Sequence, residues 1–292
     1  MKGVALIISL ICLSWSSAIN HHLTPNDFPA YLIYTSKGKE IKFSKMLKDV
    51  YEADIVFVGE LHDNPISHWM ELQLTKAMQE NTGKKLVLGA EMFESDNQLI
   101  MDEYLEGKIS EQNFKNEMRL WKNYETDYKP LVEFAKSHKL RFIATNIPRR
   151  YASIVYKKGL KSLDSLSETA KSFIAPLPIE YDSEVACYKN MLEMMGGHGG
   201  EKLPMAQAIK DATMAHFILE NWKKGQAFLH INGAYHSDDH EGIVWWLKKV
   251  NPELKIVTIT TVLQEDVNSL NEAHQDKADY VLCVNSDMTS TH

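Results

Sequence analysis

Short apolar runs alternate with longer segments of helical period along most of the chain. The runs are rich in β-branched and aromatic residues, which is typical of buried strands. They lie at Ile55–Gly59, Leu86–Ala90, Arg141–Thr145, Ala227–Asn232, Ile256–Thr260 and Tyr280–Val284. The helical segments include Phe43–Tyr51, the stretch that starts at Pro65 and stops before Gly83, Pro204–Lys224 and Gly242–Val250. This alternation predicts an α/β protein with a largely parallel central sheet and helices on both faces.

Other segments add an edge hairpin and helical excursions to this sheet. The pattern of Tyr31–Ile41 predicts a hairpin at the sheet edge with Gly38 in its turn. Two helical excursions are expected, at about residues 95–140 and 151–224. They should build a helical insertion subdomain within a single α/β domain of residues 19–292. We expect the residues after Asn285 to be disordered.

The stretch Ile55–Trp69 is the centre of this organisation. Its apolar run predicts a buried strand, and Asn64 followed by Pro65 predicts the N-cap and first residue of a helix. In that helix Ile66, Trp69 and Leu72 recur at helical spacing among the expected inward-facing residues. The turn between strand and helix carries Glu60 and His62, which are two residues apart and point the same way if the extended backbone continues. They are candidate metal ligands or an acid–base pair, unless the turn is simply a solvated polar one.

Further polar residues follow the other predicted strands. Glu91 follows the second strand, Arg149 lies just beyond the third, and His236 lies just beyond the fourth. The carboxyl ends of parallel strands share one edge, where open α/β sheets bind ligands. The set Glu60, His62, Glu91, Arg149 and His236 therefore predicts a site for a cation or for polar chemistry. The alternative is a buried polar network that only stabilises this edge.

The N-terminus predicts export. Lys2 precedes the apolar run Val4–Leu13, and Ser16–Ala18 offers small residues for cleavage, so we interpret residues 1–18 as a secretory signal peptide. The run is short for a membrane span. Cys12 suggests a lipoprotein, but Ser9–Ile11 matches the usual lipoprotein box poorly, which leaves a lipid anchor open. We expect a periplasmic protein or a membrane-anchored lipoprotein of the cell envelope.

The net charge limits the classes of binding partner, and the cysteine content limits the possible disulfides. The formal net charge of −7 argues against nucleic acid or an anionic membrane surface as the main partner. After the signal peptide only Cys187 and Cys283 remain. In an oxidising compartment these two cysteines either pair or stay buried and free.

Five motifs, in order, make the chain resemble the haem-binding uptake proteins of the ChaN type, which share a superfamily with erythromycin esterases and metal-dependent proteases. The resemblance covers nearly the whole mature chain. The motifs are Val58-Gly59-Glu60-Leu61-His62-Asp63-Asn64, Ala90-Glu91-Met92-Phe93, Tyr104-Leu105-Glu106-Gly107, Asn146-Ile147-Pro148-Arg149, and Ala206-Gln207 with Asp211-Ala212 and Met214-Ala215. The chain departs from the family pattern at Tyr235, where relatives commonly have glycine before the histidine, and at Lys210, where they usually have arginine.

The resemblance implies ferric haem held by a tyrosine, with two haems stacked face to face across a homodimer, in iron and haem uptake that involves an outer-membrane haem receptor. A phenolate is a hard oxygen donor that favours ferric iron. Our iron-ligand prediction is Tyr235, beside His236. His198 in the glycine-rich loop and Lys202 are predicted to contact the haem propionates, from this subunit or its partner.

Other side chains compete for these roles. Tyr188 and Met195 belong to a tyrosine and methionine stripe that contacts haem if it is not simply core. Tyr151, Tyr156 and Tyr181 are alternative iron ligands, and residues 191–205 are a weaker candidate for a copper site.

The rival function is hydrolysis. In the esterase and protease relatives, positions that correspond to Glu60, His62, Glu91, Arg149 and His236 do hydrolytic work, with or without a metal that activates water. This chain retains all five residues. The primary interpretation is a haem-binding transport protein, and the alternative is a metal-dependent hydrolase that uses Glu60, His62, Glu91 and His236.

Overall fold

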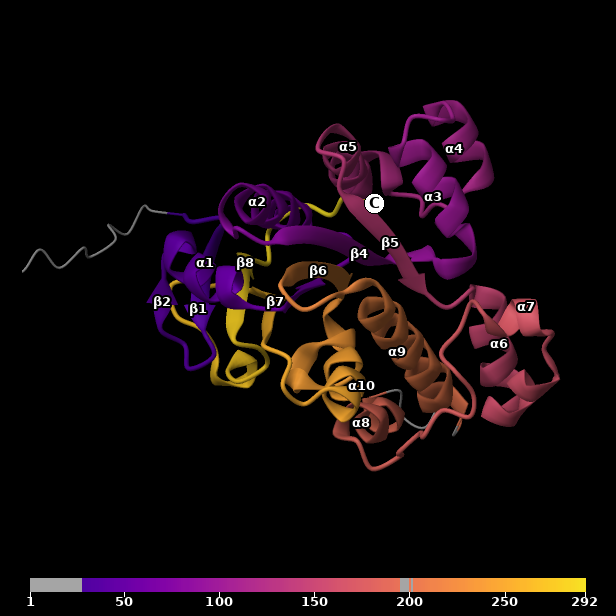
Figure 1. Ribbon diagram of the computed structural model, residues 1–292. Coiled ribbons are helices and arrows are strands. Elements are labelled where there is room, and N and C mark those ends of the chain that lie inside the picture. The colour runs from indigo at the N-terminus through magenta and orange to yellow at the C-terminus, as the bar shows by residue number, and fades with distance from the viewer. Residues whose placement is uncertain (1–27, 195–199, 201) are drawn as a thin grey trace, which may run out of the picture.

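The computed structural model describes residues 28–194, 200 and 202–292, in which eight strands form one sheet. The sheet has the order β2-β1-β8-β7-β3-β6-β4-β5 (Figure 1). The strands are β1 (Tyr31–Thr35), β2 (Glu40–Ile41), β3 (Ile55–Glu60), β4 (Lys85–Glu94), β5 (Arg141–Asn146), β6 (Gln226–Gly233), β7 (Ile256–Gln264) and β8 (Tyr280–Asn285). From β8 to β5 all neighbours pair in parallel, and only the β1 pairings with β2 and β8 are antiparallel. The predicted α/β class, the largely parallel sheet and the edge hairpin are confirmed.

Helices cover both faces of this sheet. The α-helices are α1 (Phe43–Glu52), α2 (Pro65–Asn81), α3 (Gln98–Leu105), α4 (Glu111–Glu117), α5 (Lys129–Ser137), α6 (Arg149–Lys158), α7 (Glu168–Lys171), α8 (Ala186–Met194), α9 (Lys202–Asn221) and α10 (Ile243–Val250). Shorter turns of other helix types are η1 (Ser95–Asn97), η2 (Tyr124–Tyr128), η3 (Leu160–Ser165), η4 (Ala234–His236), η5 (Asp238–His240) and η6 (Glu272–His274). The predicted Pro204–Lys224 helix ends at Asn221, before Gly225.

The central strand β3 shows how the two layers form. Val56 and Val58 belong to one hydrophobic core with α1, α2 and α5, whereas Ile55 and Phe57 belong to another with α6, α9 and α10. Successive strand residues point to opposite faces, so one buried run serves both cores. Figure 1 shows α2 and α5 on one side of the sheet and α9 and α10 on the other.

The start of α2 agrees with its predicted capping but not with its predicted inner face. The Asn64 side chain accepts the backbone N–H groups of Ile66 and Ser67, each at 3.0 Å. Trp69 was expected inside, yet it is 46% exposed, and the buried face carries His68 and Glu71. Polar side chains at the sheet edge, rather than apolar ones, occupy this part of the interior.

The C-terminal tail is ordered, so the predicted disorder after Asn285 is wrong. The backbone N–H of Thr291 donates to the Asp63 carbonyl at 2.8 Å, and the Thr291 hydroxyl donates to Asp127 at 2.8 Å. The Ser290 hydroxyl also donates to the Asp63 carboxylate at 3.0 Å. The tail therefore returns to the edge of the sheet, where Figure 1 places the C-terminus beside α5.

The expected export of the protein concerns its cysteines and its N-terminus. Cys187 is half-buried and Cys283 is buried, and both are free thiols, which answers the open question of pairing. The predicted signal peptide and Cys12 lie outside the described residues. Within the described ranges, no helix combines the length and apolar character that crossing a membrane requires.

Candidate functional site

The carboxyl ends of β3, β4 and β6 meet as the sequence predicted. Glu60 is in register with Gly233, and the Gly233 N–H donates to the Glu91 carboxylate at 2.8 Å. A side chain at Gly233 would bring its Cβ within 2.8 Å of the His62 ring. Glycine at this position therefore allows His62 and Glu91 to approach each other across the strand end.

One half of the site is a buried chain of charges around His236. Its Nε2 lies 3.1 Å from Glu91 Oε1, and its Nδ1 donates to Asp211. Burial lowers the pKa of His236, but the carboxylates of Glu91 and Asp211 outweigh burial and raise this pKa to about 10. Burial raises the pKa of Asp211, whereas His236 and His62 hold that of Glu91 well below its usual range against the effect of burial. At neutral pH an imidazolium thus lies between two carboxyl groups.

The second half is a cluster around Glu60. The Glu60 Oε1 atom lies 2.6 Å from His62 Nδ1 and accepts the Tyr128 hydroxyl at 2.7 Å. Burial raises the pKa of Glu60, but the close contacts of its carboxylate with the His62 and His68 imidazoles reverse this effect and lower the pKa to about 2. Burial lowers the pKa of His68, and the carboxylates of Glu60 and Glu71 raise it to about 11. Burial and the nearby Glu60 charge raise the pKa of Glu71 well above its usual range.

A cavity of about 360 Å³ opens over these strand ends. His62, whose side chain is 41% exposed, and the buried Glu91 line it. The complete lining is His62, Glu91, Glu94, Trp121, Asn146, Ile147, Arg149, Ala152 and Lys210. Arg149 does not pair with the predicted glutamates: its Nε lies 2.7 Å from Glu94 Oε1. An imidazole, carboxylates and two cationic side chains therefore face one polar cavity, which suits a small charged ligand or proton transfer.

Tyr235 lies next to this site but faces a different element. The tyrosine is half-buried in η4, and its hydroxyl donates to the Cys187 carbonyl in α8. Burial, followed by the nearby Cys187 and Asp211, raises the pKa of Tyr235 to about 12. Tyr235 and His236 are neighbours in sequence, yet one contacts α8 and the other lies among the buried carboxylates.

The other predicted haem contacts have varied surroundings. Tyr188 is buried, and its hydroxyl donates to Asp211 and accepts the Trp246 N–H, both at 2.9 Å. Lys202 is exposed and donates to the Lys157 carbonyl at 3.0 Å. His198 and Met195 lie outside the described residues, as does part of the proposed copper segment 191–205.

The alternative tyrosine ligands also differ in exposure. Tyr151 is buried beneath the Arg150 guanidinium, which lies 4.5 Å from the ring centroid. Tyr156 is 44% exposed, and Tyr181 is half-buried with its ring 5.7 Å from that of Tyr188.

The sequence patterns did not indicate several residues of the site. His68 and Glu71 are three residues apart on α2, which places them on one helix face beneath Glu60. The three-residue spacing could have indicated a shared polar face, but the apolar residues at helical spacing favoured a different inner face. Asp127 and Tyr128 lie in η2, for which no strand or helix pattern indicated a role.

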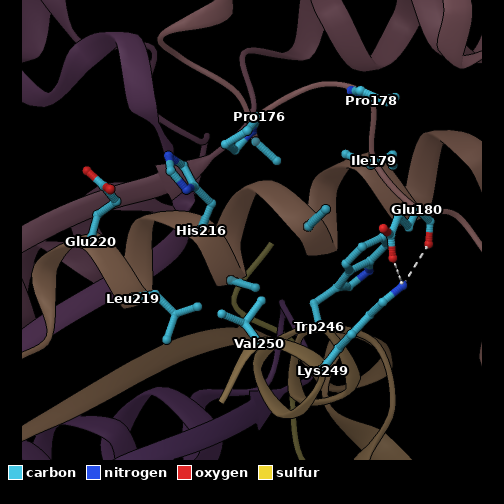
Figure 2. A pocket seen from close by; sticks show the side chains of 13 residues that line it. Pro176, Pro178, Ile179, Glu180, His216, Leu219, Glu220, Trp246, Lys249 and Val250 are labelled. Atoms are coloured by element: carbon cyan, nitrogen blue, oxygen red, sulfur yellow. Dashed lines mark hydrogen bonds and ion pairs between the residues drawn. The ribbon is translucent and has the colours of Figure 1, made fainter.

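A second cavity, of about 590 Å³, lies between the loop around Pro176 and helices α9 and α10 (Figure 2). Its wall is mostly apolar, and the Lys249 ammonium pairs with Glu180 across its rim at 2.8 Å. Within the described part of the chain, the residues that line it include none of the predicted site residues. It does not contribute to the strand-end site.

The fold and the site define an α/β protein with a buried histidine and glutamate centre at the carboxyl edge of its sheet. Residues 46–247 match the family model described as "Haem-binding uptake, Tiki superfamily, ChaN". The chain belongs to this family, which confirms the resemblance of its motifs. No curated protein matches the chain.

Several solved structures resemble this chain at low sequence identity. One is ChaN of Campylobacter jejuni, described as showing cofacial haem binding; it has a TM-score of 0.63 at 20% identity and covers 86% of this chain and 96% of that one. A Bacillus cereus protein has a TM-score of 0.50 at 14% identity, with 86% and 93% covered. The erythromycin esterase EreC has a TM-score of 0.46 at 11% identity, with 79% and 77% covered.

Proposed function

We propose that this protein binds ferric haem through Tyr235 and serves haem uptake in the bacterial envelope. The observation that carries the proposal is membership of the haem-binding uptake family over residues 46–247. As an exported protein, in the periplasm or on a lipid anchor, it would exchange haem with an outer-membrane receptor.

The residues around Tyr235 fit the role of a single oxygen ligand. Its hydroxyl has one backbone acceptor, the Cys187 carbonyl, which iron would replace when the phenol loses its proton. Both nitrogens of the neighbouring His236 are engaged by Glu91 and Asp211. His236 is therefore a poor second iron ligand, and its buried charge pairs fix the strand end from which Tyr235 projects. Bound haem would supply ferric iron for phenolate coordination.

The proposed assembly is a homodimer with two haems face to face; the Campylobacter jejuni ChaN structure is described as showing cofacial haem binding. Propionate groups would then need cations, for which Lys202 is an exposed candidate and His198 a second one. This part of the proposal rests on likeness to the family.

Titration of the purified mature protein with ferric haem tests the function directly. We expect a saturable spectrum of high-spin, oxygen-ligated iron, because a phenolate is a hard, weak-field donor. Size-exclusion chromatography of the same samples should show a monomer that becomes a dimer on loading. Weak, unsaturable binding with no change in size would contradict the proposal.

A second candidate function is hydrolysis, favoured by the cavity over His62 and Glu91. Glu60 holds His62 at 2.6 Å, so the imidazole is oriented for proton transfer toward the cavity. The test is a panel of ester and peptide substrates, assayed with and without divalent metals. For any substrate that the wild type cleaves, His62→Ala should lower kcat/KM by about 100-fold or more. The exposed His138→Ala control should retain the wild-type rate. Absence of cleavage across the panel argues against this function.

A further inference from the structure

Three buried side chains meet beneath the strand end, and four of their polar atoms lack a hydrogen-bond partner. Glu60 and Glu71 are at most 1% exposed, and His68 is 6% exposed. Among the described residues, Glu60 Oε2, His68 Nδ1 and both carboxylate oxygens of Glu71 have no hydrogen-bond partner. Buried polar groups without partners are rare in folded proteins and call for an explanation such as an ion. These four atoms belong to residues that face one another.

The distances between these atoms suit a metal ion. His68 Nδ1 lies 3.3 Å from Glu60 Oε2 and 3.6 Å from Glu71 Oε2, and one ligand atom from each residue lies within 4.8 Å of the others. In a tetrahedral site with bonds of about 2.1 Å, neighbouring ligand atoms are about 3.4 Å apart. The two separations from His68 Nδ1 therefore match the edges of a coordination tetrahedron.

A second layer of contacts orients the same three residues. The far nitrogen of His68, Nε2, lies 3.3 Å from Asp127 Oδ2, and Asp127 accepts the Asn123 amide at 2.6 Å. The second oxygen of Glu60, Oε1, is held by the Tyr128 hydroxyl at 2.7 Å. A carboxylate behind a histidine ligand, and hydrogen bonds to the free oxygen of a carboxylate ligand, are typical of metal sites.

We propose that Glu60, His68 and Glu71 bind a divalent first-row cation such as Zn²⁺, which ties the end of β3 to α2. Two carboxylates and one neutral imidazole balance the charge of a divalent cation, which would displace the protons that His68 and Glu71 otherwise hold. The ligand set includes neither Tyr235 nor the cavity-lining His62 and Glu91, and it meets that cavity only through the contact of Glu60 Oε1 with His62. Its deep burial assigns the cation a structural role.

Zinc binding by the full mature chain tests the site. Wild-type protein stripped with a chelator should bind one equivalent of Zn²⁺ in calorimetric titration, with a rise in melting temperature. Glu71→Gln, which keeps the shape but removes the charge, should weaken binding by about 100-fold. The exposed Glu80→Gln control on the same helix should bind like the wild type, and ferric haem affinity should not change in either variant.

Measurements on the wild type keep the test independent of how the variant folds. X-ray absorption of the zinc-loaded wild type should show one imidazole and oxygen donors, as expected for His68 with two glutamates. Two imidazoles, together with loss of binding in Glu91→Gln, would place the cation between His62 and His236 and overturn the proposal. Absence of zinc binding by the wild type, or unchanged binding by folded Glu71→Gln, would also overturn it.

Discussion

Tyr235→Phe is expected to weaken ferric haem binding by about 100-fold or more and to remove the phenolate-to-iron charge-transfer band. Phenylalanine keeps the ring in its half-buried position but removes the only oxygen that the side chain offers to iron. Since His236 is already held by Glu91 and Asp211, it does not replace the lost ligand. Absorbance titration and resonance Raman spectra of the ferric complex measure both effects.

The matched control is Tyr31→Phe on the antiparallel strand β1, which three strands separate from β6, the strand that leads into η4. It should keep the wild-type affinity and spectrum. The same holds for Tyr151→Phe, Tyr156→Phe and Tyr181→Phe if Tyr235 is the ligand. Loss of the charge-transfer band in one of these three, with a normal spectrum for Tyr235→Phe, would transfer the ligand role to that tyrosine.

The sequence predicted the sheet well because each parallel strand is buried on both faces. Ile55 to Val58 all face one of two cores, so the strand appears as a short unbroken apolar run, and its β-branched and aromatic residues favour a strand over a helix. The strand order was not predictable, since it depends on crossovers between distant segments. β3 pairs with β6 and β7, which follow it by more than 150 residues.

The site was predicted only where it follows strand ends. Glu60, His62, Glu91 and His236 lie at or just beyond the ends of apolar runs, and parallel topology brings such positions together. His68 and Glu71 lie inside a helix, where polar residues normally mark the solvent face. Trp69 was assigned to the interior on the same rule, and it is exposed because the buried charged cluster takes that face of α2.

Long-range polar contacts account for the other errors. The C-terminal tail has no apolar pattern that predicts order, but Ser290 and Thr291 hydrogen-bond to Asp63 and Asp127. Arg149 does line the cavity with His62 and Glu91, but its ion-pair partner, Glu94 at the end of β4, was not indicated by the sequence. Sequence periodicity carries no information about such partners.

His236→Gln is expected to lower the free energy of unfolding by about 3–5 kcal/mol near pH 6, because it removes the cation between two buried carboxyl groups. Glutamine retains hydrogen-bonding capacity and approximate size, so the loss reports the charge rather than a cavity. Urea denaturation followed by circular dichroism measures the difference between wild type and variant.

The pH dependence separates this charge effect from a packing effect. The folded-state pKa of His236, about 10, exceeds its usual 6.5, so its stabilisation is complete below about pH 6.5 and is lost as the pH rises toward 10. The pKa of Glu91 is lowered from its usual 4.5, so its contribution is present above that pH and is lost in acid. The difference between wild type and His236→Gln should therefore be greatest between about pH 4.5 and 6.5 and narrow toward pH 10. His216→Gln, a half-buried control on α9, should cost less than about 1 kcal/mol without such narrowing. A small or pH-independent loss for His236→Gln would show that the buried imidazolium does not stabilise the strand end.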